Sequence, residues 1–93
     1  MTDKYDEGKI LAGLVLGSFA KALEEVAKVG TFGANKYTPN GWKSVPMAQD
    51  RYYDALWRHL LASNYQPTDE DSGLDHLAHA AWNILALLQF RYK

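Results

Sequence analysis

Hydrophobic residues recur every three or four positions along three segments of the chain, and this period predicts an α-helix in each. The segments are residues 19–29, 46–63 and 74–92. The first apolar face consists of Phe19, Ala22, Leu23, Val26 and Val29, and the second of Ala48, Tyr52, Ala55, Leu56, His59 and Leu60. The third is wider, with Leu74, Leu77, Ala78, Ala81, Ile84, Leu85 and Leu88. The pattern therefore predicts an all-α fold, a small bundle of three main helices.

Turn-forming residues interrupt this pattern twice. Residues 30–45 contain two glycines, Pro39 and the Asn40-Gly41 pair, which predicts a structured loop long enough to have a function. Residues 64–73 form a second, acidic loop. Side chains that commonly cap helices precede two of the helices, Ser18 before the first and Asp71 or Ser72 before the third.

Residues 1–17 contain three glycines within an apolar stretch and are predicted to be an N-terminal arm or a short helix. The 93 residues allow one domain, residues 1–93. The third helix is apolar around most of its circumference, and two other helices cannot cover it. We therefore expect homo-oligomerisation to complete the bundle.

Composition narrows the classes of function. The chain has no cysteine, and its charged amino terminus does not resemble a secretory signal. Its longest apolar run is shorter than the roughly 20 residues that cross a bilayer. These features predict a soluble cytoplasmic protein without membrane contact. A net charge of -1 argues against binding to a nucleic-acid polymer.

The charges are unevenly distributed along the sequence. Residues 28–58 contain five basic residues and two acids, whereas residues 64–75 contain four acids and no base. The first region is suited to attract phosphate, and the second to attract a cation.

A polar strip runs along the third predicted helix. Asp75, His76, His79 and Asn83 are spaced by three or four residues, which places them on one side of a helix. A solvent-facing strip and a buried polar pocket account for this spacing equally well, and assembly with a partner helix is a further alternative. Zinc is the less favoured metal, because the sequence lacks a third ligand of the H-E-x-x-H type. A hard cation held by carboxylates requires fewer assumptions.

Other polar residues also have two interpretations. Glu25 lies at the edge of an apolar face, where it points either into a groove or to solvent. Asp54 and Arg58 have the spacing of a surface ion pair. Tyr37 and Trp42 next to Lys36 would suit the base and phosphates of a nucleotide, but they are equally good core material. No P-loop, nucleophile elbow or dinucleotide fingerprint is present in the sequence.

Three fragments together resemble a known family. They are "EEVAKVGTFGANKY" followed by a tryptophan, "YYDALWRHLLA", and "DEDSGLDHLAHAAWNILALL". In this order they are similar to the N-terminal domain of phage-type dATP/dGTP diphosphohydrolases, a MazG-like group of all-α nucleotide pyrophosphohydrolases. The resemblance implies a metal-dependent enzyme that converts a purine deoxynucleoside triphosphate to the monophosphate and pyrophosphate.

The resemblance also implies roles for individual residues. The predicted catalytic carboxylates are Glu25, Asp54 and Asp69, which together with Asp71 would hold Mg²⁺ or Mn²⁺. The predicted substrate-binding residues are Lys36, Tyr37, Trp42, Arg58, His59, His76, His79 and Asn83. Lys36 and Arg58 would offset phosphate charge, and Tyr37 or Trp42 would contact the base.

One position departs from the family pattern. Members often have an acid where this chain has Gln66, and a neutral amide is a poorer ligand for a hard divalent cation. This departure keeps open an alternative function, a nucleotide-binding or sequestering phage protein that does not catalyse hydrolysis.

Overall fold

The computed structural model describes residues 5 and 7–92 and contains four α-helices and one 3₁₀ helix in that part of the chain. The elements are α1 (Ala12–Gly17), α2 (Ala20–Lys36), η1 (Gly41–Ser44), α3 (Ala48–Ala62) and α4 (His76–Tyr92). No strand occurs among these residues, and the predicted all-α class is confirmed.

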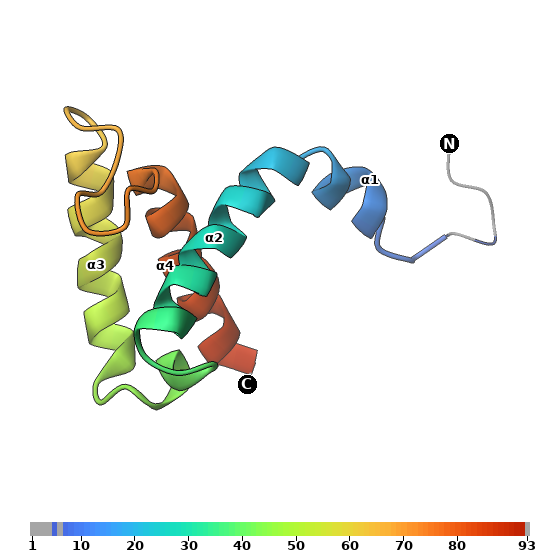
Figure 1. The fold of residues 1–93 in the computed structure, drawn as a ribbon. Helices are drawn as coiled ribbons and strands as arrows, with labels where there is room; N and C mark the ends of the chain where they lie inside the picture. Colours follow the sequence, from blue (N-terminus) through green and yellow to red (C-terminus); the bar gives the residue numbers. More distant parts are fainter. Residues whose placement is uncertain (1–4, 6, 93) are drawn as a thin grey trace.

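Helix α4 is the centre of the bundle. It packs along α3 and, on another side, against α2, while η1 rests on α3 (Figure 1). The buried apolar side chains come from all three long helices and include Val29, Leu56 and Ala86. Two aromatic residues of α4, Trp82 and Phe90, meet Trp42 of η1 and Tyr52 of α3, with ring centroids 5.3–6.4 Å apart.

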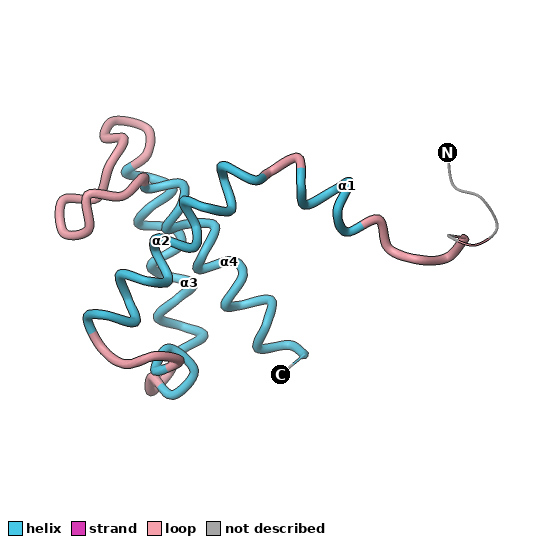
Figure 2. The backbone as a smooth tube through the Cα atoms, turned by 45° about the vertical axis from the view of Figure 1, so that its right-hand side comes forward, coloured by secondary structure: helices cyan, strands magenta, loops and turns pink. Residues whose placement is uncertain are grey.

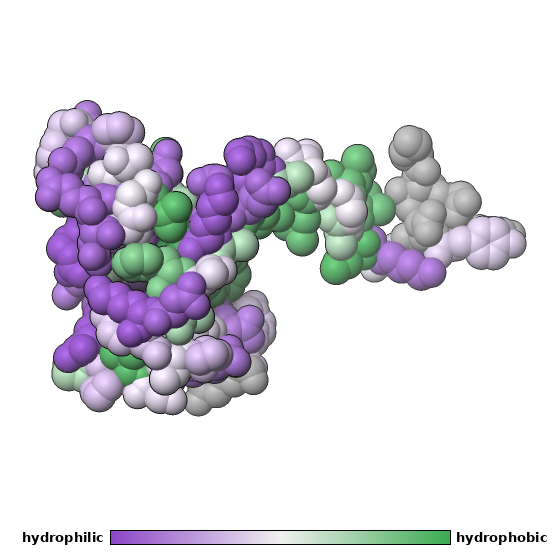
Figure 3. Space-filling view, in the orientation of Figure 1, coloured by the Kyte–Doolittle hydropathy of each residue, from purple (hydrophilic) through white to green (hydrophobic). Residues whose placement is uncertain are grey.

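Helix α1 projects away from the bundle in both views of the backbone (Figures 1 and 2). Its apolar side chains are exposed, including Leu14 and Val15, and they form a hydrophobic surface on the projecting segment (Figure 3). The predicted arm over residues 1–17 thus contains a short helix. Residues 1–4 and 6 of that arm lie outside the described residues.

Helix α2 continues to Lys36, so the prediction that it ends at residue 29 is wrong. A glycine inside a helix costs about 1 kcal/mol relative to alanine, which made Gly30 and Gly33 look like helix ends. Tertiary packing offsets that cost at Gly30, because a Cβ there would lie 3.2 Å from Nε1 of Trp82. Gly30 lets α2 approach α4 closely, and the turn follows at Asn40, whose φ is 61°.

Both predicted helix caps are also wrong. The hydroxyl of Ser18 donates to the carbonyl of Val15, 2.8 Å away, and α2 begins without a side-chain cap. Helix α4 begins at His76, where Oδ1 of Asp75 accepts the N–H of Leu77 at 2.8 Å. Asp75 caps α4 because the preceding residues are held in the loop by other hydrogen bonds.

In α4 several polar side chains are buried and several apolar side chains are exposed, which is the reverse of the usual arrangement. His76, His79 and Asn83 are buried, whereas Leu77 and Ile84 are exposed. Three of the four residues of the polar strip are therefore enclosed within the chain, and only Asp75 faces solvent. Leu85 and Leu88 are also exposed, so this part of the predicted apolar stripe lies on the outside of the chain, whereas Ala78 of the same stripe is buried. No helix in the described part of the chain is long and apolar enough to cross a membrane.

Candidate functional site

Three histidines from two helices meet at the amino-terminal end of α4. His59 lies in the last turn of α3, and His76 and His79 lie in the first turn of α4. The Nδ1 atoms of His59 and His76 are 2.9 Å apart. The rings of His59 and His79 stack, with centroids 4.4 Å apart and planes at 10°. His76 and His79 are buried and His59 is half-buried, so this histidine cluster is part of the interior of the chain.

The acidic loop closes over the histidine cluster. Oδ2 of Asp69 accepts the N–H of Ser72 at 2.9 Å, and Oγ of Ser72 lies 2.6 Å from Nε2 of His79. The loop is fixed to the start of α4 by backbone bonds, in which the N–H of Asp69 donates to Leu74 and the N–H of His76 donates to Pro67. The same short stretch therefore positions a carboxylate, a hydroxyl and two imidazoles.

One group in the described part of the chain has the composition and spacing of a metal site. One nitrogen from His59, one from His76 and a carboxylate oxygen of Asp69 all lie within 4.8 Å of one another. The group draws on α3, the acidic loop and α4. Nε2 of His76 is buried and has no hydrogen-bond partner. The three residues form a possible metal-binding group.

Burial determines the protonation of these side chains. It lowers the pKa of His59 to about 4, with a smaller contribution from the neighbouring His79. Burial also lowers the pKa of His79. Burial by itself would raise the pKa of Asp69, but the N–H and hydroxyl of Ser72 and the nearby imidazoles outweigh it, and the pKa lies below its usual value. At neutral pH the imidazoles of His59 and His79 are therefore neutral, and the carboxylate of Asp69 is ionised.

A cation from α2 reaches the acidic loop. Nζ of Lys36 lies 2.9 Å from Oδ2 of Asp71, and this ion pair raises the pKa of Lys36. The same ammonium lies over the rings of Phe32 and Tyr37, 5.7 and 5.6 Å from their centroids. Tyr37 is 73% exposed. A cation and an accessible aromatic ring are thus placed beside the acidic loop.

Comparisons with known proteins identify the family of this chain. The profile described as "dATP/dGTP diphosphohydrolase, N-terminal" matches residues 1–93. This chain belongs to that family. A dATP/dGTP diphosphohydrolase of Salmonella phage PMBT28 is 35% identical over 83 residues, which are 88% of this chain and 27% of the relative. The chain therefore spans about a quarter of the length of that relative. No solved structure matches the chain significantly.

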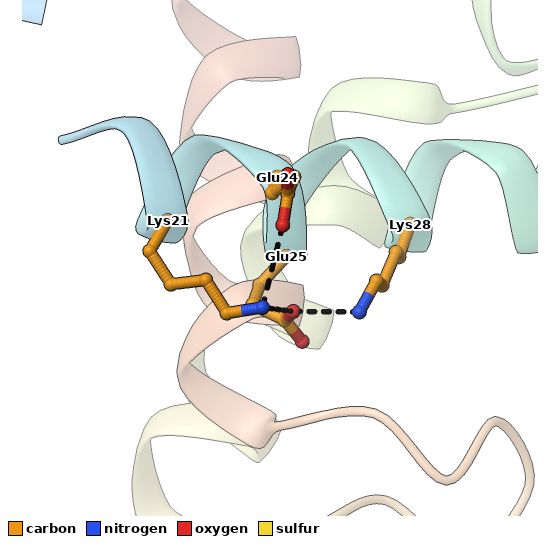
Figure 4. A network of polar contacts seen from close by, with 4 residues as sticks. All are labelled: Lys21, Glu24, Glu25 and Lys28. Atoms are coloured by element: carbon orange, nitrogen blue, oxygen red, sulfur yellow. Dashed lines mark hydrogen bonds and ion pairs between the residues drawn. The ribbon is translucent and has the colours of Figure 1, made fainter. Parts of the chain in front are cut away.

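In this member of the dATP/dGTP diphosphohydrolase N-terminal family, the four carboxylates predicted as metal ligands do not converge. Asp69 is in the possible metal-binding group, but Glu25, Asp54 and Asp71 do not join it in the described part of the chain. Glu25 instead pairs with Lys28 at 2.8 Å and Lys21 at 3.4 Å on the exposed side of α2 (Figure 4). The contact with Lys28 lowers the pKa of Glu25.

The structure separates the remaining predicted residues. Arg58 and Asp54 are exposed on α3 and, within the described residues, form no ion pair with each other. Trp42 packs in the aromatic cluster, 5.6 Å from Trp82, which favours its interpretation as core. Asn83 is buried, and its Nδ2 donates to the carbonyl of His79 at 2.8 Å. The Asn83 amide thus binds the backbone of α4 at His79.

Sequence reasoning missed two features of this family site. It assigned His59 to substrate binding and did not group it with His76 and Asp69. His59 and His76 are 17 positions apart in the sequence, and no helical period relates them. It gave Ser72 no role beyond a possible helix cap, although Ser72 contacts both Asp69 and His79. The fragment "DEDSGLDHLAH" held the available signal, a serine seven residues before His79.

Proposed function

We propose that this chain hydrolyses dATP and dGTP to the monophosphate and pyrophosphate. Its membership of the dATP/dGTP diphosphohydrolase N-terminal family and the name of the phage relative support this reaction. The observation that carries the proposal is the closure of the acidic loop over the histidine cluster, through Ser72 and His79. Ionised and neutral polar groups are held there at fixed distances, which is the arrangement that phosphoryl chemistry requires.

The nucleotide would lie along the acidic loop between the carboxyl end of α2 and the histidine cluster. Lys36 offsets the triphosphate charge after exchanging its partner Asp71 for a phosphate oxygen. Tyr37 offers an exposed ring for the base. Arg58, which is exposed near His59 in α3, supplies a second cation. His59 and His79 are neutral and orient phosphate oxygens without adding positive charge.

The resemblance also implies Mg²⁺ or Mn²⁺ as a cofactor. A hard cation of this kind prefers several oxygen ligands, and the carboxylates of Glu25, Asp54 and Asp71 are too far apart in this chain to join Asp69. The set of four carboxylates therefore does not fit such an ion within one chain. A divalent cation remains part of the proposed reaction.

The proposal is tested by incubating the purified chain with dATP, dGTP, dCTP or dTTP and a divalent cation. We expect release of the monophosphate and pyrophosphate in equal amounts, faster from the two purine nucleotides, and loss of both products when a chelator is added. Release of inorganic phosphate, or an absence of products under conditions in which a full-length family enzyme is active, would contradict the proposal.

A second candidate function is nucleotide binding without hydrolysis. Gln66 favours it, since the family often has an acid at this position, and here the amide donates to the carboxylate of Glu70 at 3.4 Å. Calorimetry with dGTP separates the two functions. Stoichiometric binding without product identifies a binding or sequestering protein, and product formation excludes it.

We further propose that the chain is a homo-oligomer in the host cytoplasm. The outer side of α4 exposes Leu77, Ile84, Leu85 and Leu88, and a groove of about 610 Å³ between α3 and α4 is lined partly by Ile84 and Leu88. A contiguous apolar surface of this kind marks an interaction site. Light scattering during size exclusion gives the mass, and a monomer at micromolar concentration would contradict the proposal.

A further inference from the structure

The possible metal-binding group has a composition that selects among metals. It offers two imidazole nitrogens, from His59 and His76, and one carboxylate oxygen, from Asp69. Imidazole suits Zn²⁺ and the neighbouring transition metals, whereas Mg²⁺ prefers carboxylates, carbonyls and water. Among the described residues no group of three carboxylates of matching spacing offers an alternative for Mg²⁺.

The spacing of the three residues also suits one ion. Zn–N bonds of about 2.0–2.1 Å in tetrahedral geometry place two ligand nitrogens about 3.3 Å apart. The Nδ1 atoms of His59 and His76 lie 2.9 Å apart, and separating them by about 0.4 Å would admit an ion between them. Asp69 and His59 are only half-buried, which leaves a route for the ion from solvent.

His76 would bind the ion through Nδ1, because one imidazole binds an ion through only one of its nitrogens. The side chain is buried, with 5% of the residue's surface exposed, and Nδ1 faces only the imidazole of His59. The other nitrogen, Nε2, has no hydrogen-bond partner and stays outside the coordination of this ion. Apart from His59, an ion at Nδ1 would displace no partner of this buried ring.

We propose that His59, Asp69 and His76 bind one borderline divalent ion of the Zn²⁺ class, which includes Co²⁺ and Ni²⁺, in preference to Mg²⁺. Three protein ligands leave at least one coordination position for water or a phosphate oxygen. The N–H of Ser72 holds the Asp69 carboxylate in place, as residues around metal ligands commonly do.

The test measures metal binding without nucleotide, so its result does not depend on hydrolysis. The chain, stripped with a chelator, is titrated with Zn²⁺ by calorimetry and with Co²⁺ by visible absorption. We expect one ion per chain, Co²⁺ bands typical of nitrogen and oxygen ligands, and retention of Co²⁺ in a large excess of Mg²⁺. Sub-stoichiometric binding, Co²⁺ bands without nitrogen ligands, or displacement by an equal concentration of Mg²⁺ would overturn the proposal.

Two matched substitutions locate the ion. Asp69→Asn and Asp71→Asn remove the same charge from the same loop, but only Asp69 belongs to the group. We expect Asp69→Asn and His59→Gln to weaken Zn²⁺ binding at least about tenfold and Asp71→Asn to change it less than about twofold. Equal weakening by the two aspartate variants would place the ion on the exposed acids instead. Circular dichroism checks that each variant folds. If a variant does not fold, the Co²⁺ spectrum of the unmodified chain still tests whether nitrogen ligands bind the ion.

Discussion

The Nδ1 atoms of His59 and His76 face each other at 2.9 Å, in the interior between α3 and α4. A hydrogen bond at this distance requires one nitrogen to carry a proton and the other to accept it. If both rings were protonated on both nitrogens, neither Nδ1 could accept, and two like charges would lie in contact where little water can screen them. The pair therefore holds together only while at least one of the two rings is neutral.

Acid should destabilise the metal-free chain through His59. Its pKa is about 4 when folded and about 6.5 when unfolded, so the unfolded chain binds more protons between these values. Stability is then highest above pH 6.5 and is lost as the pH falls towards 4, by at most about 3 kcal/mol. Urea unfolding with a chelator at pH 7 and pH 4.5 measures this change.

A variant separates His59 from the other ionisable groups around it. Asp69, His76, His79 and Arg58 all face or influence the His59 ring. His59→Phe should reduce the pH dependence between 4.5 and 6.5, while the part due to His79 remains there and the part due to Asp69 persists at lower pH. An unchanged slope in His59→Phe would assign the acid sensitivity to other residues.

Two glycines of α2 should respond differently to alanine. A Cβ at Gly33 meets nothing within 4 Å, so Gly33→Ala should raise the free energy of unfolding by about 0.5–1 kcal/mol through helix propensity. A Cβ at Gly30 would lie 3.2 Å from Nε1 of Trp82, so Gly30→Ala should give no gain. Urea denaturation measures the free energy of unfolding of both variants. Equal stabilisation by the two substitutions would show that α2 and Trp82 are not in close contact at Gly30.

The hydroxyl of Tyr52 should contribute to stability. It donates to the carbonyl of Trp42 at 2.6 Å and so ties η1 to α3. Tyr52→Phe keeps the ring contact with Trp82 but leaves that carbonyl unpaired, and we expect a loss of about 0.5–1.5 kcal/mol in thermal unfolding. Tyr53→Phe is the control, since Tyr53 is exposed, and it should unfold like the unmodified chain.

Lys36 should affect nucleotide affinity more than turnover. If Lys36 contacts phosphate, Lys36→Met should raise KM for dGTP about tenfold with a smaller change in kcat. Lys28→Met is matched to it, because Lys28 is on the same helix and also pairs with an acid, Glu25. Steady-state kinetics of the two variants decide the matter: similar KM values would remove Lys36 from the nucleotide site.

The sequence by itself determined the class of fold and the family. Helical periodicity located the three long helices, since apolar residues three or four positions apart share one side of a helix. The fragments around Lys36, His59 and His79 identified the family because they are contiguous in sequence. The i, i+3 and i, i+4 spacing also placed His76, His79 and Asn83 on one side of α4, because helix geometry alone fixes such neighbours.

Only the tertiary structure decided which side of α4 is buried and which residues form the site. Polarity alone would have turned the leucines inward, but packing of α3 and the acidic loop enclosed the histidines instead. Helix α2 passes through Gly30 because Trp82, 52 residues further along, offers a close contact. His59 meets His76 and Asp69 for the same reason: contacts between distant segments depend on how helices pack in space, and no local period in the sequence encodes them.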